Sequence, residues 1–221
     1  LNFYREAGYF PDALLNYLGM MGWTMPQGEE KFTLAEMIDA FDLKRVSLGG
    51  PVFDIQKLTW LNALYMREQS TSQMVQNLRD QLFPEAFLTQ IAPLVHERID
   101  KWEDFIDCAG FFFQGQLHFD DEAQKHLVPK KKTPKDMAKT LSLLTEKIDT
   151  MSELKADTLD QTIRQLCEEI GWKAKEVFMP LRIVITGKKG SPPLLESMEV
   201  LGKEQCRRRL RYAIGWLKSV N

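Results

Sequence analysis

Apolar residues recur every three or four positions along almost the whole 221-residue chain, whereas the alternation typical of a half-buried strand is nearly absent. In the segment 3–22 the helical stripe consists of Ala13, Leu14, Tyr17, Leu18 and Met21. Pro11 stands where such a helix begins, and Gly22 stands where it ends. This periodicity predicts a helix whose apolar stripe packs on a core.

Further helical segments follow, separated by loops that contain proline or glycine. Thr33 is a predicted N-cap because Glu36 follows three residues later. The apolar face after this cap consists of Leu34, Met37, Ile38 and Phe41. We predict more helices over 54–68, 72–82, 84–97, 100–110, 135–150, 158–170 and 203–218. The run RIVIT (182–186) fits either a short strand or a helix, so we expect an all-α protein of two or three helical units.

The composition narrows the class of protein. Apolar residues make up 44% of the chain and charged residues 27%, as in ordinary globular proteins. The chain has no apolar run of about 18 residues, so we expect no transmembrane helix. Its first residues carry charges and do not resemble a secretory signal. The three isolated cysteines, Cys108, Cys167 and Cys206, fit reduced thiols of a cytoplasmic protein better than disulfides or a zinc site.

Charge is distributed unevenly along the chain. Residues 1–50 hold 4 Lys and Arg against 7 Asp and Glu, and residues 51–128 hold 6 against 12. Residues 129–221 hold 19 against 12, so a polyanion is expected to bind mainly there, unless these helices simply present solvated basic faces. A cluster near the end would suit phosphate contacts and consists of Arg207, Arg208, Arg209 and Arg211. Because one helical face cannot hold all four, we expect at least one internal salt bridge.

No catalytic constellation stands out in the sequence. A phosphate-binding glycine loop of the Walker or dinucleotide type is missing. The histidines, His96, His118 and His126, lack the spacing of metal ligands, so no metal site is expected. Cys108 lies near His118 in sequence, but its surroundings (FIDCAGFFF) are apolar rather than electropositive, which favours a buried structural thiol. These absences indicate a binding module.

The strongest binding signal is the segment TGKKGSPPL (186–194), which follows Arg182. Proteins recognise single-stranded RNA with arginine planes, polar side chains and exposed loop backbone. The adjacent prolines have fixed φ angles and no N–H, so they would form a stiff wall for a base. The alternative is a surface loop that merely connects two helices.

Two blocks of the sequence resemble a known family. The first runs from YREAGYFPDALLNYLGMMGW (4–23) through FTLAEMIDAFDLKRVSLGGPVFDIQKLTWLNALYMRE (32–68). The second is PLRIVITGKKGSPPLLESMEVLGKE (180–204). Both resemble bacterial-type glutamyl-tRNA synthetases, and the middle, 72–170, agrees with them in order and length. The resemblance thus covers essentially the whole chain.

The resemblance implies a domain organisation. Residues 1–70 would form a stem-contact domain, and 71–130 and 131–221 would form two helical anticodon-binding subdomains, joined near the candidate linker LVPKKKTPK (127–135). The catalytic fold, with its HIGH and KMSKS-like motifs, would lie upstream of Leu1. The parent enzyme would be a glutamate–tRNA ligase that uses ATP and Mg²⁺. The chain would then resemble a fragment that contains no catalytic residue and no cofactor, and that is inactive alone.

The resemblance also assigns binding roles. The anticodon-binding positions would be Arg98, Arg164, Arg182, Ser191, Pro192 and Leu194. Leu195 stands where the family often has an aromatic residue, which puts a stacking contact there in doubt. The stem-contact block would contribute Trp60 and Asn62, although Trp60 fits a core position equally well. The partners implied are tRNA-Glu and the parent's catalytic domain in cis, with no membrane and no DNA.

Arg98, in LVHERIDKWEDF (94–105), matches the position associated with reading the third anticodon base. In the family, arginine there goes with enzymes that accept tRNA-Glu and reject tRNA-Gln, whereas glutamine goes with enzymes that accept both. A guanidinium offers a fork of donors to a pyrimidine edge, and it clashes with the exocyclic groups of a purine. The alternative for Arg98 is a surface ion pair with Glu97 or Asp100. For the chain as a whole, the alternative is a helical protein-interaction domain that does not bind RNA.

Overall fold

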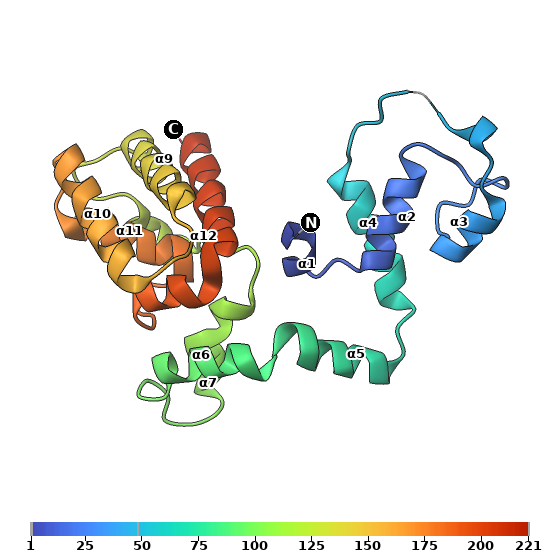
Figure 1. The fold of residues 1–221 in the computed structure, drawn as a ribbon. Coiled ribbons are helices and arrows are strands. Elements are labelled where there is room, and N and C mark those ends of the chain that lie inside the picture. The colour runs from blue at the N-terminus through green and yellow to red at the C-terminus, as the bar shows by residue number, and fades with distance from the viewer. Residues whose placement is uncertain (1, 48, 221) are drawn as a thin grey trace. The chain divides into compact units, whose positions relative to one another are not determined.

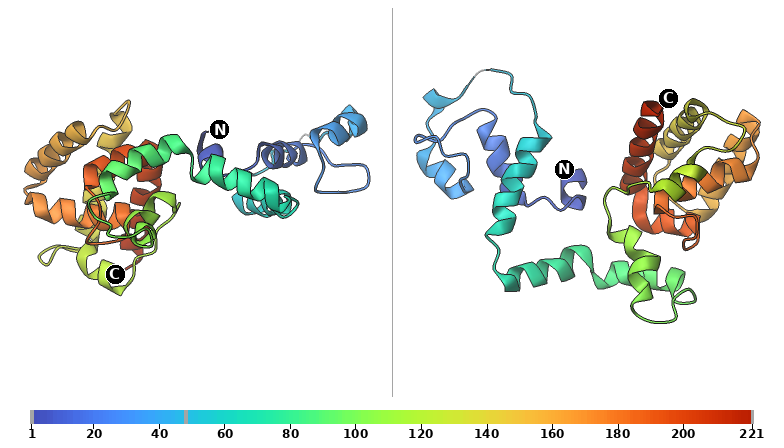
Figure 2. Two further views of the ribbon diagram at one scale, coloured as in Figure 1. Left: turned by 90° about the horizontal axis from the view of Figure 1, so that it is seen from below. Right: turned by 180° about the vertical axis from the view of Figure 1, so that it is seen from behind.

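The computed structural model describes residues 2–47 and 49–220, and every regular element in these ranges is helical. This confirms the all-α prediction. The chain divides into two compact units, Leu1–Leu82 and Phe83–Asn221, which are considered separately below (Figures 1 and 2). No helix in the described part of the chain is both long and apolar enough to cross a membrane.

The first unit is built around the packing of α2 on α4. Its elements are α1 (Asn2–Glu6), α2 (Pro11–Met20), α3 (Leu34–Ala40), η1 (Leu43–Arg45), α4 (Ile55–Arg67), α5 (Thr71–Asn77) and η2 (Leu78–Leu82), the last a π-helical turn. The buried core of this unit is small and centres on Tyr17, Leu58 and Leu61. Asn16 is also buried, and its amide donates to Glu30 O and accepts from Phe32 N, each at 3.1 Å.

Two predicted apolar faces differ from the structure. On α2, Ala13 and Tyr17 are buried as expected, but Leu18 is 46% exposed and the buried neighbour is the polar Asn16. Asn16 satisfies two backbone groups of the 30–32 loop, so a hydrogen-bonding requirement outweighs hydrophobic periodicity there. On α3, the capping box of Thr33 and Glu36 is confirmed, yet three of the four apolar residues are exposed: Leu34, Ile38 and Phe41.

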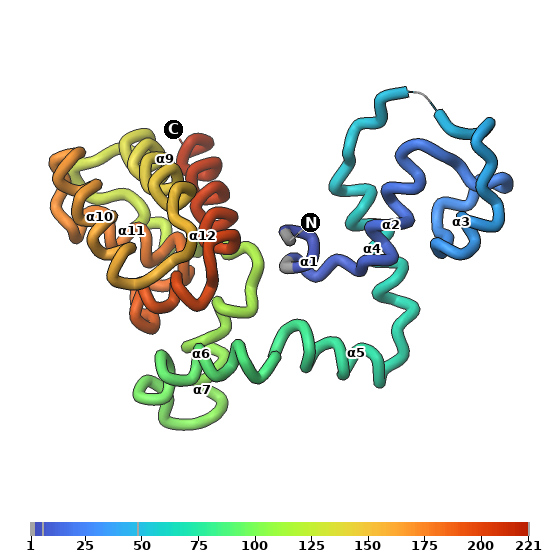
Figure 3. Tube along the Cα trace, in the orientation of Figure 1, coloured from blue at the N-terminus to red at the C-terminus, as the bar shows by residue number. Residues whose placement is uncertain are grey.

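The second unit is a larger helical assembly. Its elements are α6 (Glu85–Val95), α7 (Asp104–Ala109), η3 (Gly110–Phe113), α8 (Asp121–Leu127), α9 (Pro134–Thr150), α10 (Ala156–Ile170), α11 (Ala174–Thr186) and α12 (Leu194–Ser219). α9 and α12 lie side by side, and α11 packs on both α8 and α12 (Figures 1 and 3). α12 is interrupted at Gly202, whose φ of 76° is not helical, so the predicted final helix from 203 onward is confirmed.

Two buried clusters stabilise this unit. The smaller one joins α6, α7 and η3 through Ile91, Val95, Ala109, Phe111, Phe112 and Leu117. The larger one starts at Phe119 and includes both Leu127 and Met137, which lie on either side of the segment 129–133. That segment is a short turn closed by a hydrogen bond from Lys132 N to Pro129 O of 2.9 Å. Whether 70/71 and 130/131 divide the chain into tRNA-contacting domains stays a prediction.

The ambiguous run 182–186 is helical and forms the last turns of α11. Ile183, Val184 and Ile185 are all at most 1% exposed, because several other helices surround this part of α11. Burial on every side explains why the run has no helical alternation of polar and apolar residues. α11 ends at Gly187, which adopts a positive φ of 76° and turns the chain into the loop before α12.

Candidate nucleic-acid interface

Arg182 and the segment 187–193 between α11 and α12 form one hydrogen-bonded structure, which we call the Arg182 loop. The Arg182 guanidinium donates to Ser191 Oγ at 2.7 Å and to Pro192 O at 2.9 Å. Pro192 is buried and Ser191 is half-buried, so the guanidinium holds the two residues against the end of α11. Three residues expected at the anticodon, Arg182, Ser191 and Pro192, are therefore brought together by direct contacts.

Further cations lie close to this loop. Burial lowers the pKa of Arg182, and the nearby charge of Arg98 lowers it further. Burial raises the pKa of the Cys108 thiol, while the charges of Arg98 and Lys188 oppose that rise. Lys188 Nζ donates to Asp107 O at 2.9 Å, which connects the loop to α7. Arg98, Arg182 and Lys188 thus concentrate positive charge at one place, although Arg98 is more than eighty residues away from the other two in sequence.

The Arg98 side chain is exposed, and it forms no ion pair with Glu97 or Asp100 in the part of the chain that the structure describes. The structure therefore does not contain the surface ion pair that was the alternative role for Arg98. Its guanidinium donors face solvent beside the Arg182 loop and are available to a ligand. Arg98 owes its position to the turn that follows α6, where its backbone N–H donates to Val95 O at 2.8 Å.

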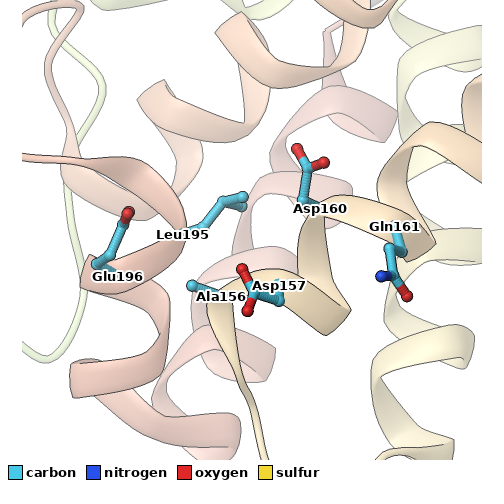
Figure 4. A pocket seen from close by; sticks show the side chains of 6 residues that line it. All are labelled: Ala156, Asp157, Asp160, Gln161, Leu195 and Glu196. Carbon is cyan, nitrogen blue, oxygen red and sulfur yellow. The ribbon is translucent and has the colours of Figure 1, made fainter.

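A pocket of about 350 Å³ opens next to this loop, between the first turns of α10 and α12 (Figure 4). Its lining comprises Ala156, Asp157, Asp160, Gln161, Leu195 and Glu196. The charge of Glu196 raises the pKa of Arg182, against the larger effect of burial, so the pocket adjoins the Arg182 loop. Arg164 reaches the edge of the pocket through an ion pair from its Nε to Asp160 of 2.6 Å, and its guanidinium also lies 5.7 Å from the Phe178 ring centroid.

Leu194 and Leu195 have different environments. Leu194 is 4% exposed and belongs to the larger core, whereas Leu195 lines the pocket. The role predicted for Leu194 in lining an anticodon pocket stays a prediction, and its burial leaves Leu195 as the side chain that a ligand would meet.

The two stem-contact candidates lie in the first unit. Trp60 is 42% exposed, so it does not belong to the core, and Lys57 Nζ lies 4.1 Å from its ring centroid. Asn62 Oδ1 accepts a 2.8 Å hydrogen bond from Phe10 N, directly before α2. Asn62 therefore has a structural role in the unit, while Trp60 offers an exposed part of its ring to a ligand.

Two arginines of the cluster near the end of the chain have structural roles, and phosphate contacts by the others stay a prediction. Arg209 is 2% exposed and donates to three backbone carbonyls, those of Phe111, Gln114 and Ile185. Arg207 Nε forms an ion pair with Asp149 at 2.6 Å, which confirms the expected internal salt bridge. Arg211 is exposed. The helix presents its arginines to different neighbours because consecutive residues lie on different faces.

Sequence reasoning missed the carboxylates of the pocket and the bridging role of Lys188. Asp157 and Asp160 stand in an amphipathic helix, where acidic residues are usually solvated. Glu196 is the third residue of α12, and nothing in its local sequence distinguishes it from any other acid in the first turn of a helix. The proximity of the start of α10 to the start of α12 is a tertiary contact that neither segment encodes alone. In the described residues, no group of three or more His, Cys, Asp and Glu side chains could hold a metal ion.

Comparison with known proteins gives two family matches. Residues 70–214 match the anticodon binding domain family. Residues 1–60 match the family described as tRNA synthetases class I (E and Q), catalytic domain. The front of the chain therefore falls within a catalytic-domain family, and its separate role as a stem-contact domain stays a prediction.

Individual relatives agree with these matches. A glutamate–tRNA ligase of Stutzerimonas stutzeri is 38% identical over 214 residues, which cover 97% of this chain and 43% of that protein. One of Pseudomonas aeruginosa is 41% identical over 215 residues, with the same coverage. A crystal structure of a glutamate tRNA ligase from Elizabethkingia meningosepticum in complex with its amino acid matches 97% of this chain and 43% of that one, with a TM-score of 0.55 and 30% identity.

The chain thus spans less than half the length of the relatives that it matches. The anticodon binding domain match covers well over half of the chain, including Arg98, Arg164, Arg182 and the loop before α12. The chain therefore belongs to the anticodon-binding domain family, and it corresponds to the C-terminal region of the glutamyl-tRNA synthetases.

Proposed function

We propose that this chain binds tRNA-Glu and reads its anticodon for a glutamyl-tRNA synthetase. The observation that carries this proposal is the Arg182 loop, in which one guanidinium holds Ser191 and Pro192 while the exposed Arg98 lies close by. A rigid loop beside exposed guanidinium donors is the kind of surface that holds unstacked bases by their edges.

The pocket beside the loop adds acceptors to these donors. The carboxylates of Asp157, Asp160 and Glu196 can accept hydrogen bonds from the exocyclic amino groups of bases, as carboxylates do from cytosine N4. Arginine donors on one side and carboxylate acceptors on the other discriminate bases by their edges. Arg164, held by Asp160, would join this surface when a base displaces its ion pair.

The remaining functions of these relatives would require a longer parent protein. By analogy with the ligases that it resembles, the parent would attach glutamate to tRNA-Glu with ATP and Mg²⁺, in the cytoplasm, with the catalytic domain acting in cis. Trp60 in the first unit, with its exposed ring, would contact the body of the tRNA, and Asn62 would support the helix beside it.

Arg98→Gln tests the reading of the third anticodon base. The wild-type chain should bind tRNA-Glu more tightly than a tRNA-Glu variant changed at that base, because the guanidinium fork fits only one of the two edges. The substitution removes the charge and the fork of donors. We therefore expect the ratio of the affinity for tRNA-Glu to the affinity for the changed tRNA to fall by roughly tenfold or more. Calorimetry or gel shift at fixed salt measures both affinities.

Arg211→Gln is the matched control, since Arg211 is also exposed in the same unit and lies outside the loop. It should leave the ratio unchanged. Equal affinity of the wild-type chain for both RNAs would contradict the role of Arg98. Binding of neither RNA would contradict the proposed function itself and would favour a protein-interaction domain.

A further inference from the structure

Positive charges without an ion-pair partner gather near the start of α11 in the second unit. Several basic residues between 129 and 221 are engaged internally, among them Lys147, Lys155, Arg164, Lys203, Arg207 and Arg209. Six lysines form no ion pair in the described part of the chain, and all of them lie within three residues of Lys132 or Trp172, whose side chains are in contact. We call them the lysine cluster: Lys130, Lys131, Lys132, Lys135, Lys173 and Lys175.

The contact between Lys132 and Trp172 brings the cluster together. Lys132 Nζ lies 4.4 Å from the centroid of the Trp172 ring, which is half-buried. Lys132 closes the turn after α8, and Trp172 lies in the turn between α10 and α11, where Gly171 has a positive φ of 68°. The cation–π contact therefore joins two turns that are about forty residues apart, each of which carries further lysines.

The two acidic residues in the same turns offset only part of the charge of the six lysines. Asp136 accepts hydrogen bonds from Thr133, both from its N–H at 2.9 Å and from its hydroxyl at 2.7 Å. These bonds lower the pKa of Asp136, with smaller effects from the charges of Lys132 and Lys135. Glu176 accepts a 2.8 Å hydrogen bond from Lys173 N. Both carboxylates thus cap helices, and the six lysines leave a positive surface.

We propose that the lysine cluster binds phosphates of the RNA backbone, at a distance from the residues that read bases. This inference rests on the proposed function. The cluster lies at the start of α11 and the Arg182 loop at its end, and a helix of 13 residues is about 20 Å long. An RNA strand of several nucleotides spans that distance, so an RNA whose loop contacts Arg182 can place backbone phosphates over the lysines.

Lysine is suited to this task because an ammonium group is a point charge on a flexible stem. It attracts phosphates without fixing the identity of the base. The cluster would therefore contribute affinity that depends on salt, whereas the Arg182 loop would contribute discrimination that does not. Because one site would contribute affinity and the other discrimination, an experiment that measures both quantities distinguishes the two sites.

The test is the triple variant Lys130→Ala, Lys131→Ala, Lys173→Ala. Its affinity for tRNA-Glu is measured at several salt concentrations. For each phosphate that the variant no longer neutralises, the slope of log affinity against log salt should become shallower by about 0.7 to 0.9. We expect a weaker affinity at low salt, a shallower slope, and an unchanged ratio between tRNA-Glu and the third-base variant. Circular dichroism checks that the variant remains folded.

The matched control is Lys125→Ala, Lys147→Ala, Lys155→Ala, which removes the same charge from the same unit. These lysines are already paired, with Glu122, Glu169 and Glu199 respectively. An equal loss of affinity in the control would show a net-charge effect and overturn the cluster. The proposed role of the cluster would also be overturned if the wild type bound RNA and the triple variant showed the same dependence of affinity on salt. If the triple variant lost binding to polyglutamate but kept its RNA affinity, the surface would belong to an acidic protein. Failure of the wild type to bind would contradict the proposed function as well.

Discussion

At the scale of single residues, Arg209 shows how far a side chain's role can depart from its sequence context. It lies in a basic run that reads as a phosphate-binding surface, yet it is 2% exposed and its hydrogen bonds go to backbone carbonyls. Burial lowers its pKa to about 10, so the guanidinium still carries its charge at neutral pH. Its donors join η3 to the end of α11, and thereby the smaller cluster to the segment that carries Arg182.

Replacing Arg209 with Met tests this connection. Methionine fills a similar volume, but the carbonyls of Phe111, Gln114 and Ile185 lose their donors, and a buried acceptor without a partner costs about 1 to 3 kcal/mol. We expect the free energy of unfolding to fall by about 3 kcal/mol in urea titrations. Arg211→Met, on the exposed side of the same helix, should change it by less than about 0.5 kcal/mol. An unchanged or higher stability of Arg209→Met would mean that desolvation of the charge outweighs its hydrogen bonds.

The local part of the candidate site could be predicted from the sequence, and the non-local part could not. The segment with Arg182, Ser191 and Pro192 spans eleven residues; two glycines lie within it, and its last residue begins a pair of adjacent prolines. By contrast, the proximity of Arg98 depends on packing between helices, and the burial of Arg209 rather than Arg211 depends on which face of α12 meets η3. Neither fact has a signal in the neighbouring residues.

At the scale of elements, helices differ in how far along the sequence the residue that caps their first turn lies. The box of Thr33 and Glu36 was predictable because both partners lie within four residues. The start of α10 has no side-chain cap of its own. Instead Glu199 of α12 accepts from Ala156 N at 2.9 Å and pairs with Lys155 at 3.0 Å. A cap from 43 residues away cannot be predicted from the sequence around the helix.

Glu199→Gln tests this distant cap through the pH dependence of stability. The hydrogen bonds from Ala156 and Lys155 lower the pKa of Glu199 below its ordinary value of 4.5. The charged carboxylate therefore stabilises the folded state. This stabilisation is fully present above pH 4.5 and is lost as the pH falls through the lowered pKa. The glutamine variant should lose less stability than the wild type on acidification below that value, as measured by urea midpoints. Parallel curves for the two proteins would contradict the role of the charge.

At the scale of the whole molecule, the sequence indicates where turns lie more clearly than where one buried core ends and the next begins. The proline- and lysine-rich segment 127–135 is a predicted linker, and that division stays a prediction. In the structure one buried cluster includes core residues on both sides of the segment. The change of core falls between Leu117 and Phe119, where an aromatic-rich sequence gives no sign of a boundary. Similarly, the compact units divide at Leu82 and Phe83, beyond the serine and threonine that mark a helix start at 70–71.

Each unit has its own core, so we expect the chain to unfold in two steps. Leu61 is fully buried in the small core of the first unit, and Leu144 is fully buried in the large core of the second. Leu61→Ala should lower the stability of the first unit, and Leu144→Ala that of the second, each by about 2 to 5 kcal/mol. Trp23 and Trp60 report on the first unit by fluorescence, and Trp102, Trp172 and Trp216 report on the second.

Single-tryptophan versions of the chain resolve the two steps in a denaturant titration. Leu61→Ala should shift only the transition seen at Trp23, and Leu144→Ala only the transition seen at Trp216, because a cavity acts on the core that surrounds it. The smaller core should unfold first, since it buries less apolar surface. If either substitution shifted both transitions equally, the units would form one cooperative structure, and the second unit would depend on the first unit for its stability.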